Sequence, residues 1–249
     1  MMNNGIGVII SNGTLRYTDS QSPIISGLKM TIPKGKWTAI LGRSGCGKTS
    51  ILRYLAGLLK NKVEWSGDIH IDGTESIEGK IAYMAQQDLL MPWLNVIDNV
   101  CFASKFSEDR KEDKNRAFEL LELVGLKGYE RSMPSQLSGG MRQRVALART
   151  LMQDKPLVLM DEPFSALDAV TRYRLQNLAA QVLVDKTVLL ITHDPQEALR
   201  LSDRVYIMKG RPASTISLTV PNTPIPRKIN AELAVLQQQI IDSLEVDYV

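Results

Sequence analysis

The stretch that decides the fold lies at residues 42–49 and reads Gly42-Arg43-Ser44-Gly45-Cys46-Gly47-Lys48-Thr49. It follows the pattern G-x-x-x-x-G-K-[ST], a phosphate-cradling loop that joins a strand to a helix. Residues 37–41 are apolar and β-rich, and residues 50–58 repeat apolar side chains at helical spacing and end near a glycine. Strand, turn and helix in this order aim backbone N–H groups at one anion. A tight turn that happens to contain a lysine is the alternative interpretation.

The side chains of this loop suit a phosphate ligand. Its glycines let the backbone wrap a phosphate without Cβ clashes. Lys48 adds a mobile positive charge for the β- and γ-phosphate oxygens, and the hydroxyl of Thr49 is expected to bind a magnesium ion. Cys46 is either a loop filler or the point at which a thiol reagent inactivates the protein.

Length and composition bound the remaining possibilities. A chain of 249 residues buries one sizeable core, with room for an inserted subdomain but hardly for two full domains. The net charge of +3 is spread along the chain, so nucleic acid is not expected as a partner. The two cysteines, Cys46 and Cys101, suggest neither a disulfide framework nor a metal site. Without a signal peptide or a membrane-spanning stretch, the protein is expected in the cytosol, and any membrane association must come through a partner.

The N-terminal part predicts antiparallel strands ahead of a parallel α/β core. Short strands at residues 6–10 and 14–17 flank Asn12-Gly13, a good hairpin signal, and a third strand at 28–32 reaches a turn at 33–36. Tyr17 has two possible roles, a half-buried strand aromatic or a ring that stacks on adenine, and local evidence leaves both open.

The middle of the chain changes to a helical pattern. Strands are expected at residues 67–71 and 80–84, and helices at 96–102, at 109–124 and from about Ser138. The mixed-charge run at 107–114 predicts a solvated helix start. We therefore expect an inserted helical subdomain at 87–145, and a nucleotide-binding core with its N-terminal β subdomain at 1–86 and 146–220.

The β/α alternation then resumes and ends in one more helix. Strands are expected at residues 157–160, 187–191, 204–209 and 214–220, and helices at 169–184 and 195–201. Residues 221–249 are expected to form a proline-rich connector and a C-terminal helix whose apolar face carries Leu233, Leu236, Ile240 and Leu244.

Two adjacent carboxylates, Asp161 and Glu162, end the buried strand at residues 157–160. Ligand sites of open α/β sheets lie at such strand ends, and burying this charge needs a function or a cation. In a nucleotide hydrolase, Asp161 would hold the magnesium shell and Glu162 would polarise the attacking water. An acidic pair that faces solvent is the alternative.

A second candidate anion site lies at residues 137–144. Ser138 is a strong N-cap, and Gly139 and Gly140 allow a close backbone approach at an electropositive helix start. Because one phosphate loop already serves one nucleotide, this site is expected to serve the nucleotide of another subunit; a plain capped helix start is the alternative. His193 follows another buried strand and is either a structural histidine or a γ-phosphate sensor.

Together these stretches resemble the ATP-binding subunit of an ABC transporter over about the first 215 residues. The resemblance implies a P-loop NTPase (RecA-like) α/β core with an antiparallel β subdomain and an inserted helical subdomain. It assigns catalytic roles to Glu162 and His193, and magnesium binding to Thr49, Gln86 and Asp161. It also resolves Tyr17 in favour of adenine stacking. The implied ATP contacts are Tyr17, Gly42, Arg43, Ser44, Gly45, Cys46, Gly47, Lys48, Thr49, Ser50, Gln86, Ser138, Gly139, Gly140 and Asp168. Met141, where many members carry glutamine, is the one departure.

Finer resemblance points to importers. Residues 162–168 are similar to importer ATPases, and residues 89–100 look like the nitrate/sulfonate/taurine group, which includes hydroxymethylpyrimidine-type importers. This implies ATP, Mg²⁺, a second copy of the chain, transmembrane permease subunits and, indirectly, a solute-binding protein, at the cytoplasmic face of the cell membrane. The apolar surface at 89–94 would receive a permease helix, with Trp93 either exposed there or packed in the core.

Two rivals remain at this stage. A soluble ABC-type ATPase of DNA repair, translation or iron–sulfur assembly usually shows tandem cassettes, coiled-coil insertions or basic patches. A P-loop kinase would leave residues 137–144 unexplained.

Overall fold

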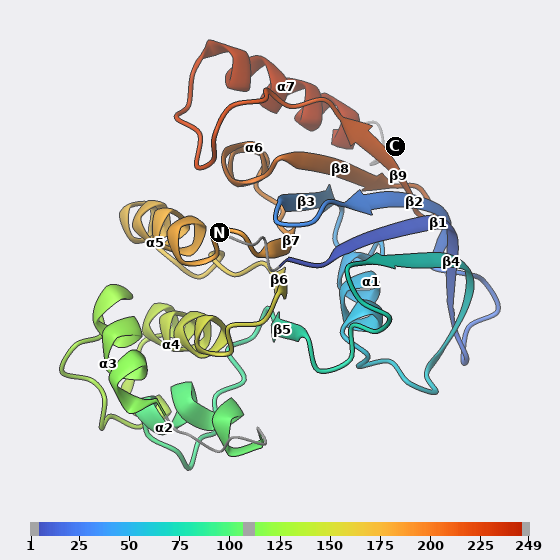
Figure 1. Cartoon of the computed structure of the whole chain (residues 1–249). Helices are drawn as coiled ribbons and strands as arrows, with labels where there is room; N and C mark the ends of the chain where they lie inside the picture. The colour runs from blue at the N-terminus through green and yellow to red at the C-terminus, as the bar shows by residue number, and fades with distance from the viewer. Residues whose placement is uncertain (1–4, 107–112, 246–249) are drawn as a thin grey trace. The chain divides into compact units, whose positions relative to one another are not determined.

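The computed structural model describes residues 5–106 and 113–245, and it divides into two compact units (Figure 1). The first unit comprises Met1–Ile81, Pro156–Asp161 and Asp185–Val249, and the second comprises Ala82–Lys155 and Glu162–Val184. The second unit extends beyond the helical insert expected at 87–145, because it also takes in residues 82–86, 146–155 and 162–184. The functional division into core, insert and C-terminal extension stays a prediction.

The antiparallel sheet of the first unit has the strand order β2-β1-β4. Its strands are β1 (Gly7–Tyr17), β2 (Ile25–Ile32) and β4 (Val63–Asp72). The hairpin predicted at Asn12-Gly13 is wrong, since β1 runs through both residues as one strand. The pairing of β1 shifts register there against both neighbours, and Asn12 has a positive φ of 54°. The two residues form a bulge because strands on both sides hold β1 in line.

The second sheet has the order β5-β6-β7-β3-β8-β9. Its strands are β3 (Trp37–Gly42), β5 (Ile81–Met84), β6 (Leu157–Asp161), β7 (Thr187–Ile191), β8 (Arg204–Lys209) and β9 (Ser214–Leu218). β3, β6 and β7 are buried along their whole length and pair in parallel, as their continuous apolar sequences predict. β9, at the edge of the sheet, runs antiparallel to its neighbour β8.

Helix α1 (Lys48–Leu55) follows β3 and packs against β3 and β6. It ends earlier than the predicted residues 50–58 because Gly57, with a φ of 73°, stops it. The Gly57 and Leu58 amides donate to the carbonyls of Tyr54 and Arg53, which is a Schellman cap.

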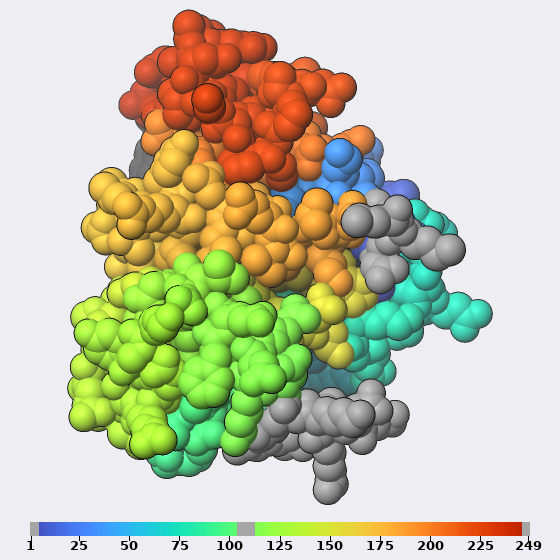
Figure 2. Space-filling model, turned by 60° about the vertical axis from the view of Figure 1, so that its left-hand side comes forward, coloured from blue at the N-terminus to red at the C-terminus, as the bar shows by residue number. Residues whose placement is uncertain are grey.

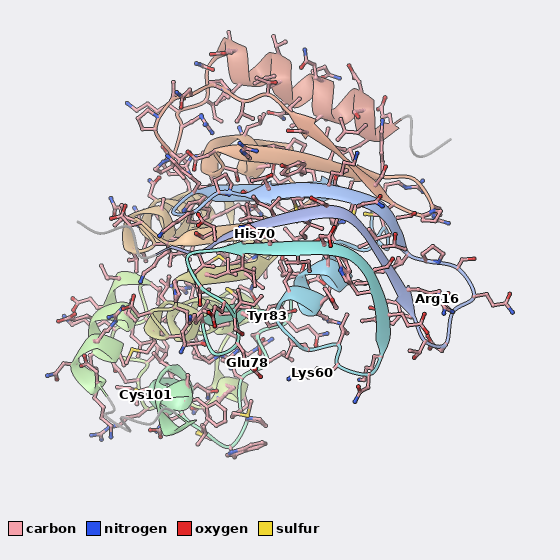
Figure 3. The ribbon with its side chains drawn as sticks, turned by 45° about the vertical axis from the view of Figure 1, so that its right-hand side comes forward. Arg16, Lys60, His70, Glu78, Tyr83 and Cys101 are labelled. Atoms are coloured by element: carbon pink, nitrogen blue, oxygen red, sulfur yellow. The ribbon has the colours of Figure 1, made fainter. Side chains whose placement is uncertain are left out.

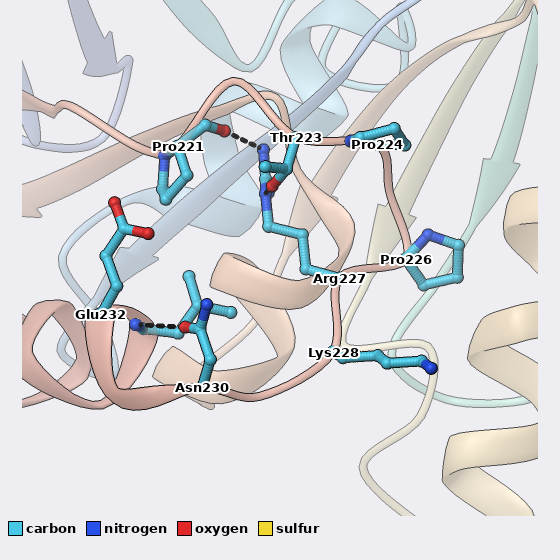
Figure 4. Close-up of a pocket in the computed structure, with 9 residues that line it drawn as sticks. Pro221, Thr223, Pro224, Pro226, Arg227, Lys228, Asn230 and Glu232 are labelled. Carbon is cyan, nitrogen blue, oxygen red and sulfur yellow. Dashed lines mark hydrogen bonds between the residues drawn. The ribbon is translucent and has the colours of Figure 1, made fainter.

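The C-terminal extension packs on the same unit. Helix α7 (Ala231–Glu245) buries Leu233 and Ile240 against helix α6 (Pro195–Leu201) and strands β3 and β8, and its outer face is visible in Figure 2. Arg227 is only 5% exposed and donates to the carbonyls of Leu199 and Ser202. It also donates to the carbonyl of Pro221, a contact that Figure 4 shows. Burial lowers the pKa of Arg227. This guanidinium caps the C-terminal end of α6, so the proline-rich connector is an ordered part of the unit.

The second unit is helical. It contains α2 (Val96–Val100), the 3₁₀ segments η1 (Cys101–Phe106) and η2 (Pro134–Gln136), α3 (Lys114–Leu123), α4 (Gly139–Met152) and α5 (Ala169–Val182). Helices α2 and α3 pack on α4. The predicted helix at 109–124 begins only at Lys114, capped by Asp113, and residues 107–112 of the mixed-charge run lie outside the described residues. Across residues 5–106 and 113–245, no helix is both long and apolar enough to cross a membrane.

Candidate functional site

The phosphate loop connects β3 directly to α1. A Cβ atom added at Gly42 would lie 2.4 Å from the carbonyl oxygen of Met208 and 3.0 Å from Sγ of Cys46. Gly47 has a φ of 106°, a backbone conformation that other residues rarely adopt. The chain's own packing therefore requires glycine at both positions, and the turn is built to this one shape.

Lys48 lies inside the loop rather than in solvent. Its side chain leaves the residue only 7% exposed, and Nζ donates to the carbonyls of Gly42 and Arg43, each at 2.7 Å. The ammonium group thus holds the first two residues of the loop close to the start of α1 by hydrogen bonds. The first turn of α1 carries no acidic side chain, so the positive end of its dipole is not neutralised from within the helix.

Three strands bring further predicted residues to the edge of the sheet at which the loop begins. Asp161 on β6 pairs with Ile191 on β7, and Ile191 pairs with Ile40 on β3, two residues before Gly42. All three strands are parallel, so their carboxyl ends share one edge. Asp161, 2% exposed, lies at this edge, and His193, which is exposed, follows the end of β7. In the first unit, the phosphate loop, Asp161 and His193 therefore all lie at the same edge of the sheet.

Tyr17, at the end of β1, reaches the phosphate-loop helix. Its hydroxyl lies 2.9 Å from Oγ of Ser50, one residue beyond the loop. The predicted adenine-stacking ring and the predicted phosphate loop are therefore directly connected within the first unit.

Glu162 is the first residue of the second segment of the second unit, and its backbone is strained. Its φ of 49° is uncommon for a residue with a side chain, and such strain is concentrated at functional positions. Gln86 donates from Nε2 to Oε2 of Glu162 at 3.2 Å. The sequence placed both residues in the site but did not reveal this contact, since 76 residues separate them.

The start of α4 has an N-cap and an open surface. The hydroxyl of Ser138 accepts from the Met141 amide at 3.3 Å, as predicted for a capped helix. A Cβ at Gly139 would meet, outside its own helical turn and among the described residues, only the end of the Arg142 side chain at 3.8 Å. Ser138 and Gly139 are both exposed. Nothing in the described fold of this chain explains why position 139 is glycine.

Asp168 is the N-cap of α5 and is also exposed. Its carboxylate accepts from the Thr171 amide at 3.0 Å. This backbone hydrogen bond lowers the pKa of Asp168. The local structure thus gives Asp168 a capping role, beside the nucleotide contact that the resemblance implies.

Sequence reasoning missed a set of contacts that join the segment after Gln86 to α4. Arg142 donates to the carboxylate of Asp88 at 2.9 Å, and Arg149 donates to the carbonyls of Asp88 and Leu89 at 2.6 and 2.8 Å. Burial lowers the pKa of Arg149. The sequence places both arginines on the predicted helix. Their partners lie about 60 residues away, and no local sequence pattern predicts these contacts.

Trp93 is 71% exposed, so of its two possible places, exposed on the surface at 89–94 or packed in the subdomain core, the structure shows the exposed one. The loop that carries it is rigidly held by Asn99, which is fully buried. Oδ1 of Asn99 accepts from the Met91 amide, and Nδ2 donates to the carbonyls of Met91, Leu94 and Asn95.

Comparison with known proteins places this geometry in a family. The model of the family described as ABC transporter matches residues 25–165. An uncharacterized ABC transporter ATP-binding protein of Haemophilus influenzae is 43% identical and covers 87% of this chain and 90% of its own length. An aliphatic sulfonates import ATP-binding protein of Rhodococcus jostii is 40% identical, with 92% and 89% covered. A protein of the same description from Pseudomonas syringae is also 40% identical, with 91% and 92% covered.

A solved structure agrees with these relatives. A dimeric ATP-binding cassette in a post-hydrolysis state, bound to ADP and phosphate, matches with a TM-score of 0.73 and 28% identity, over 87% of this chain and all of that chain. The predicted fold class is therefore confirmed. The chain belongs to the ABC transporter family, as one of its ATP-binding and ATP-hydrolysing subunits.

Proposed function

We propose that the chain powers a solute importer, and that two copies close on ATP so that each nucleotide lies between residues 42–49 of one copy and residues 138–140 of the other. The observation that carries this proposal is the open position at Gly139, which is exposed and has room for a larger side chain. A glycine without a role in its own chain is explained if an outside ligand approaches that backbone closely. A self-complementary two-fold interface then builds two equal sites.

The magnesium ion of this site fits the oxygen donors that the sequence predicts. Mg²⁺ prefers one or two carboxylates together with neutral oxygens and phosphates. Asp161 supplies a buried carboxylate at the strand edge, and Thr49 supplies a hydroxyl from the start of α1. Gln86, the third predicted ligand, has an amide oxygen that remains available while Nε2 donates to Glu162. When bound, the ion neutralises charge on the β- and γ-phosphates.

Within each site, we assign proton and charge handling to three residues. Glu162 accepts a proton from the attacking water, and His193 contacts the γ-phosphate from the end of β7. Lys48 already has its ammonium group inside the loop, held by two carbonyls. A phosphate that enters the loop therefore meets a charge that needs little reorganisation.

The permease is proposed to dock on the surface formed by Leu89, Met91 and Trp93. Leu89 is 53% exposed and Trp93 71%, and both side chains belong to a segment fixed by Asn99 and Arg149. A large, rigid aromatic side chain is a typical anchor for a partner. Arg142 and Arg149 connect this segment to α4, so movement of the start of α4 can be passed to the permease.

The cargo is proposed to belong to the sulfonate group of importer substrates, on the strength of the names of the relatives. In this proposal a solute-binding protein and the permease select the cargo, and this chain works at the cytoplasmic face of the membrane. A soluble ATPase of DNA repair, translation or iron–sulfur assembly is not favoured, because the similar proteins are named as importer subunits.

The test is the variant Glu162→Gln. Removing the proton acceptor while keeping the side-chain size is expected to leave ATP binding intact, to slow hydrolysis by at least about 100-fold and to trap an ATP-bound dimer. Gel filtration with ATP and single-turnover hydrolysis measure both effects. Near-normal turnover would remove Glu162 from this role, and a variant that stays monomeric with bound ATP would contradict the two-copy site.

A further inference from the structure

The indole of Trp65, on β4, is fixed from several directions. Its ring stacks on Tyr54 of α1, with ring centroids 4.6 Å apart and an interplanar angle of 17°. Its Nε1 donates to the carbonyl of Gly67 at 3.0 Å. A Cβ at Gly13 would lie 2.4 Å from the indole, so this glycine leaves the space that the ring occupies. The bulge at Asn12-Gly13 thus has a local purpose, which is to seat Trp65 against β1.

Trp65 and Tyr17 project from the same face of the antiparallel sheet. In the pairing of β1 with β4, Leu15 lies opposite Trp65 and Tyr17 lies opposite Val63. Directly opposed residues share a face, and residues two apart on one strand share it too. Arg16, labelled in Figure 3, lies opposite Glu64 in the same ladder, and the two side chains form an ion pair on the other face.

Helix α1 presents a matching pair of side chains to this face. Ser50 and Tyr54 are four residues apart and therefore lie one above the other on the helix. Ser50 contacts the hydroxyl of Tyr17, and Tyr54 stacks on Trp65. The end of β1 is thus attached to the phosphate-loop helix directly, by the Tyr17–Ser50 hydrogen bond, and indirectly through its neighbour β4, whose Trp65 stacks on Tyr54.

The second attachment matters because β1 is not a continuous ladder. Its pairing with β4 shifts register between Ser11 and Thr14, so the part of the strand that carries Tyr17 is separated by a bulge from the part anchored deeper in the sheet. Stacked aromatic rings contribute beyond the area that they bury, whereas one partly exposed hydrogen bond contributes little. The stack is therefore the stronger of the two attachments.

We propose that Trp65 and Tyr54 are positioning residues for ATP binding: their stack sets where the ring of Tyr17 stands relative to the phosphate loop, and so sets the share of affinity that comes from the adenine base. This inference rests on the proposed adenine contact of Tyr17. The inference treats the affinity for the base and the affinity for the phosphates separately, because the phosphates would be bound from α1 and the base from β1.

The experiment compares a ligand with a base and a ligand without one. Binding of MgATP and of magnesium tripolyphosphate is titrated for the wild type, Trp65→Leu and Tyr54→Leu, each also in a Tyr17→Ala background. Loss of a base–aromatic stack costs about tenfold in affinity. Each leucine variant is expected to weaken MgATP by about that factor, to leave tripolyphosphate unchanged, and to have no further effect once Tyr17 is alanine. Tyr54→Phe and Trp65→Phe, which keep an aromatic ring, are the matched controls and should bind MgATP within about twofold of the wild type.

Several outcomes would overturn the inference. An equal loss for both ligands would mean that the stack supports the loop itself, and unchanged MgATP affinity would mean that it positions nothing. A loss that persists in the Tyr17→Ala background would show that the stack does not act through Tyr17. The adenine contact on which the inference rests is tested separately in the same series, since Tyr17→Ala alone should weaken MgATP binding by about tenfold and leave tripolyphosphate binding unchanged.

Discussion

The phosphate loop and the start of α4 are both glycine-containing turns at the beginning of a helix, but they differ in how closely the rest of the chain packs around them. At residues 42–49 the loop is enclosed by its own protein: a Cβ at Gly42 would strike the backbone of Met208, and Lys48 donates to two loop carbonyls. At residues 138 and 139 the turn is exposed, and among the described residues a Cβ at Gly139 would meet, outside its own helical turn, a flexible arginine end at 3.8 Å. The first turn is determined by folding, whereas the second keeps a glycine that folding does not need.

This difference suggests how the two halves of the proposed shared site would divide their tasks. A loop that binds ATP in the separate subunit must be preformed, because ordering it on binding would reduce affinity. A surface that only completes the site in another copy must stay open until that copy arrives. The predictions below test this distinction in order of decreasing effect.

The largest effect is expected from Gly42→Ala set against Gly139→Ala. The methyl group at position 42 has no space, so overpacking should lower the free energy of unfolding by about 2 kcal/mol and abolish ATP binding. The methyl group at position 139 has space, so stability should change by less than about 0.5 kcal/mol while multiple-turnover hydrolysis falls. Thermal unfolding, ATP titration and phosphate release measure the three quantities. Equal stability loss in both variants would remove the distinction.

Lys48→Ala is expected to have the next largest effect. It removes a charge aimed at the phosphates and the two hydrogen bonds that Nζ donates to the carbonyls of Gly42 and Arg43, so ATP affinity should fall by about 10- to 100-fold. Direct binding titration checks this. Lys60→Ala is the matched control, because Lys60 has a side chain that is 76% exposed and pairs with Glu78 on the surface (Figure 3). Affinity that is equal in both variants would count against the phosphate role of Lys48.

The fold was largely predictable where burial alone decides the structure. Three elements have the predicted bounds: the strands at 187–191 and 204–209 and the helix at 195–201. The strands are mostly apolar, and the helix starts at a proline that follows the N-cap Asp194, so few alternatives remain. Asn12-Gly13 was mistaken for a hairpin because local turn chemistry does not reveal that β2 and β4 pair on both sides. The Gln86–Glu162 and Arg142–Asp88 contacts join distant segments, and no local pattern encodes them.

A smaller effect concerns the reactivity of Cys46, which is 7% exposed in the phosphate loop. Alkylation of Cys46 should be slow, and it should abolish ATP binding. Bound ATP should lower the alkylation rate further, in proportion to the fraction of loops that it occupies. Mass spectrometry of the labelled peptide measures it. Cys101, 1% exposed in the second unit, is an internal control whose labelling should not respond to ATP. If ATP leaves the labelling rate of Cys46 unchanged, the thiol does not lie beside bound phosphate.

The most direct test of the central claim mixes two inactive variants. Lys48→Ala damages the phosphate loop, and Gly139→Asp places a negative charge at the open turn; each homodimer then has two damaged sites. A mixed dimer pairs the intact loop of one copy with the intact turn of the other. Random mixing makes about half of the dimers mixed, each with one good site of two, so we expect about a quarter of wild-type turnover to return. Turnover of the mixture that equals the mean of the two separate variants would contradict the shared site.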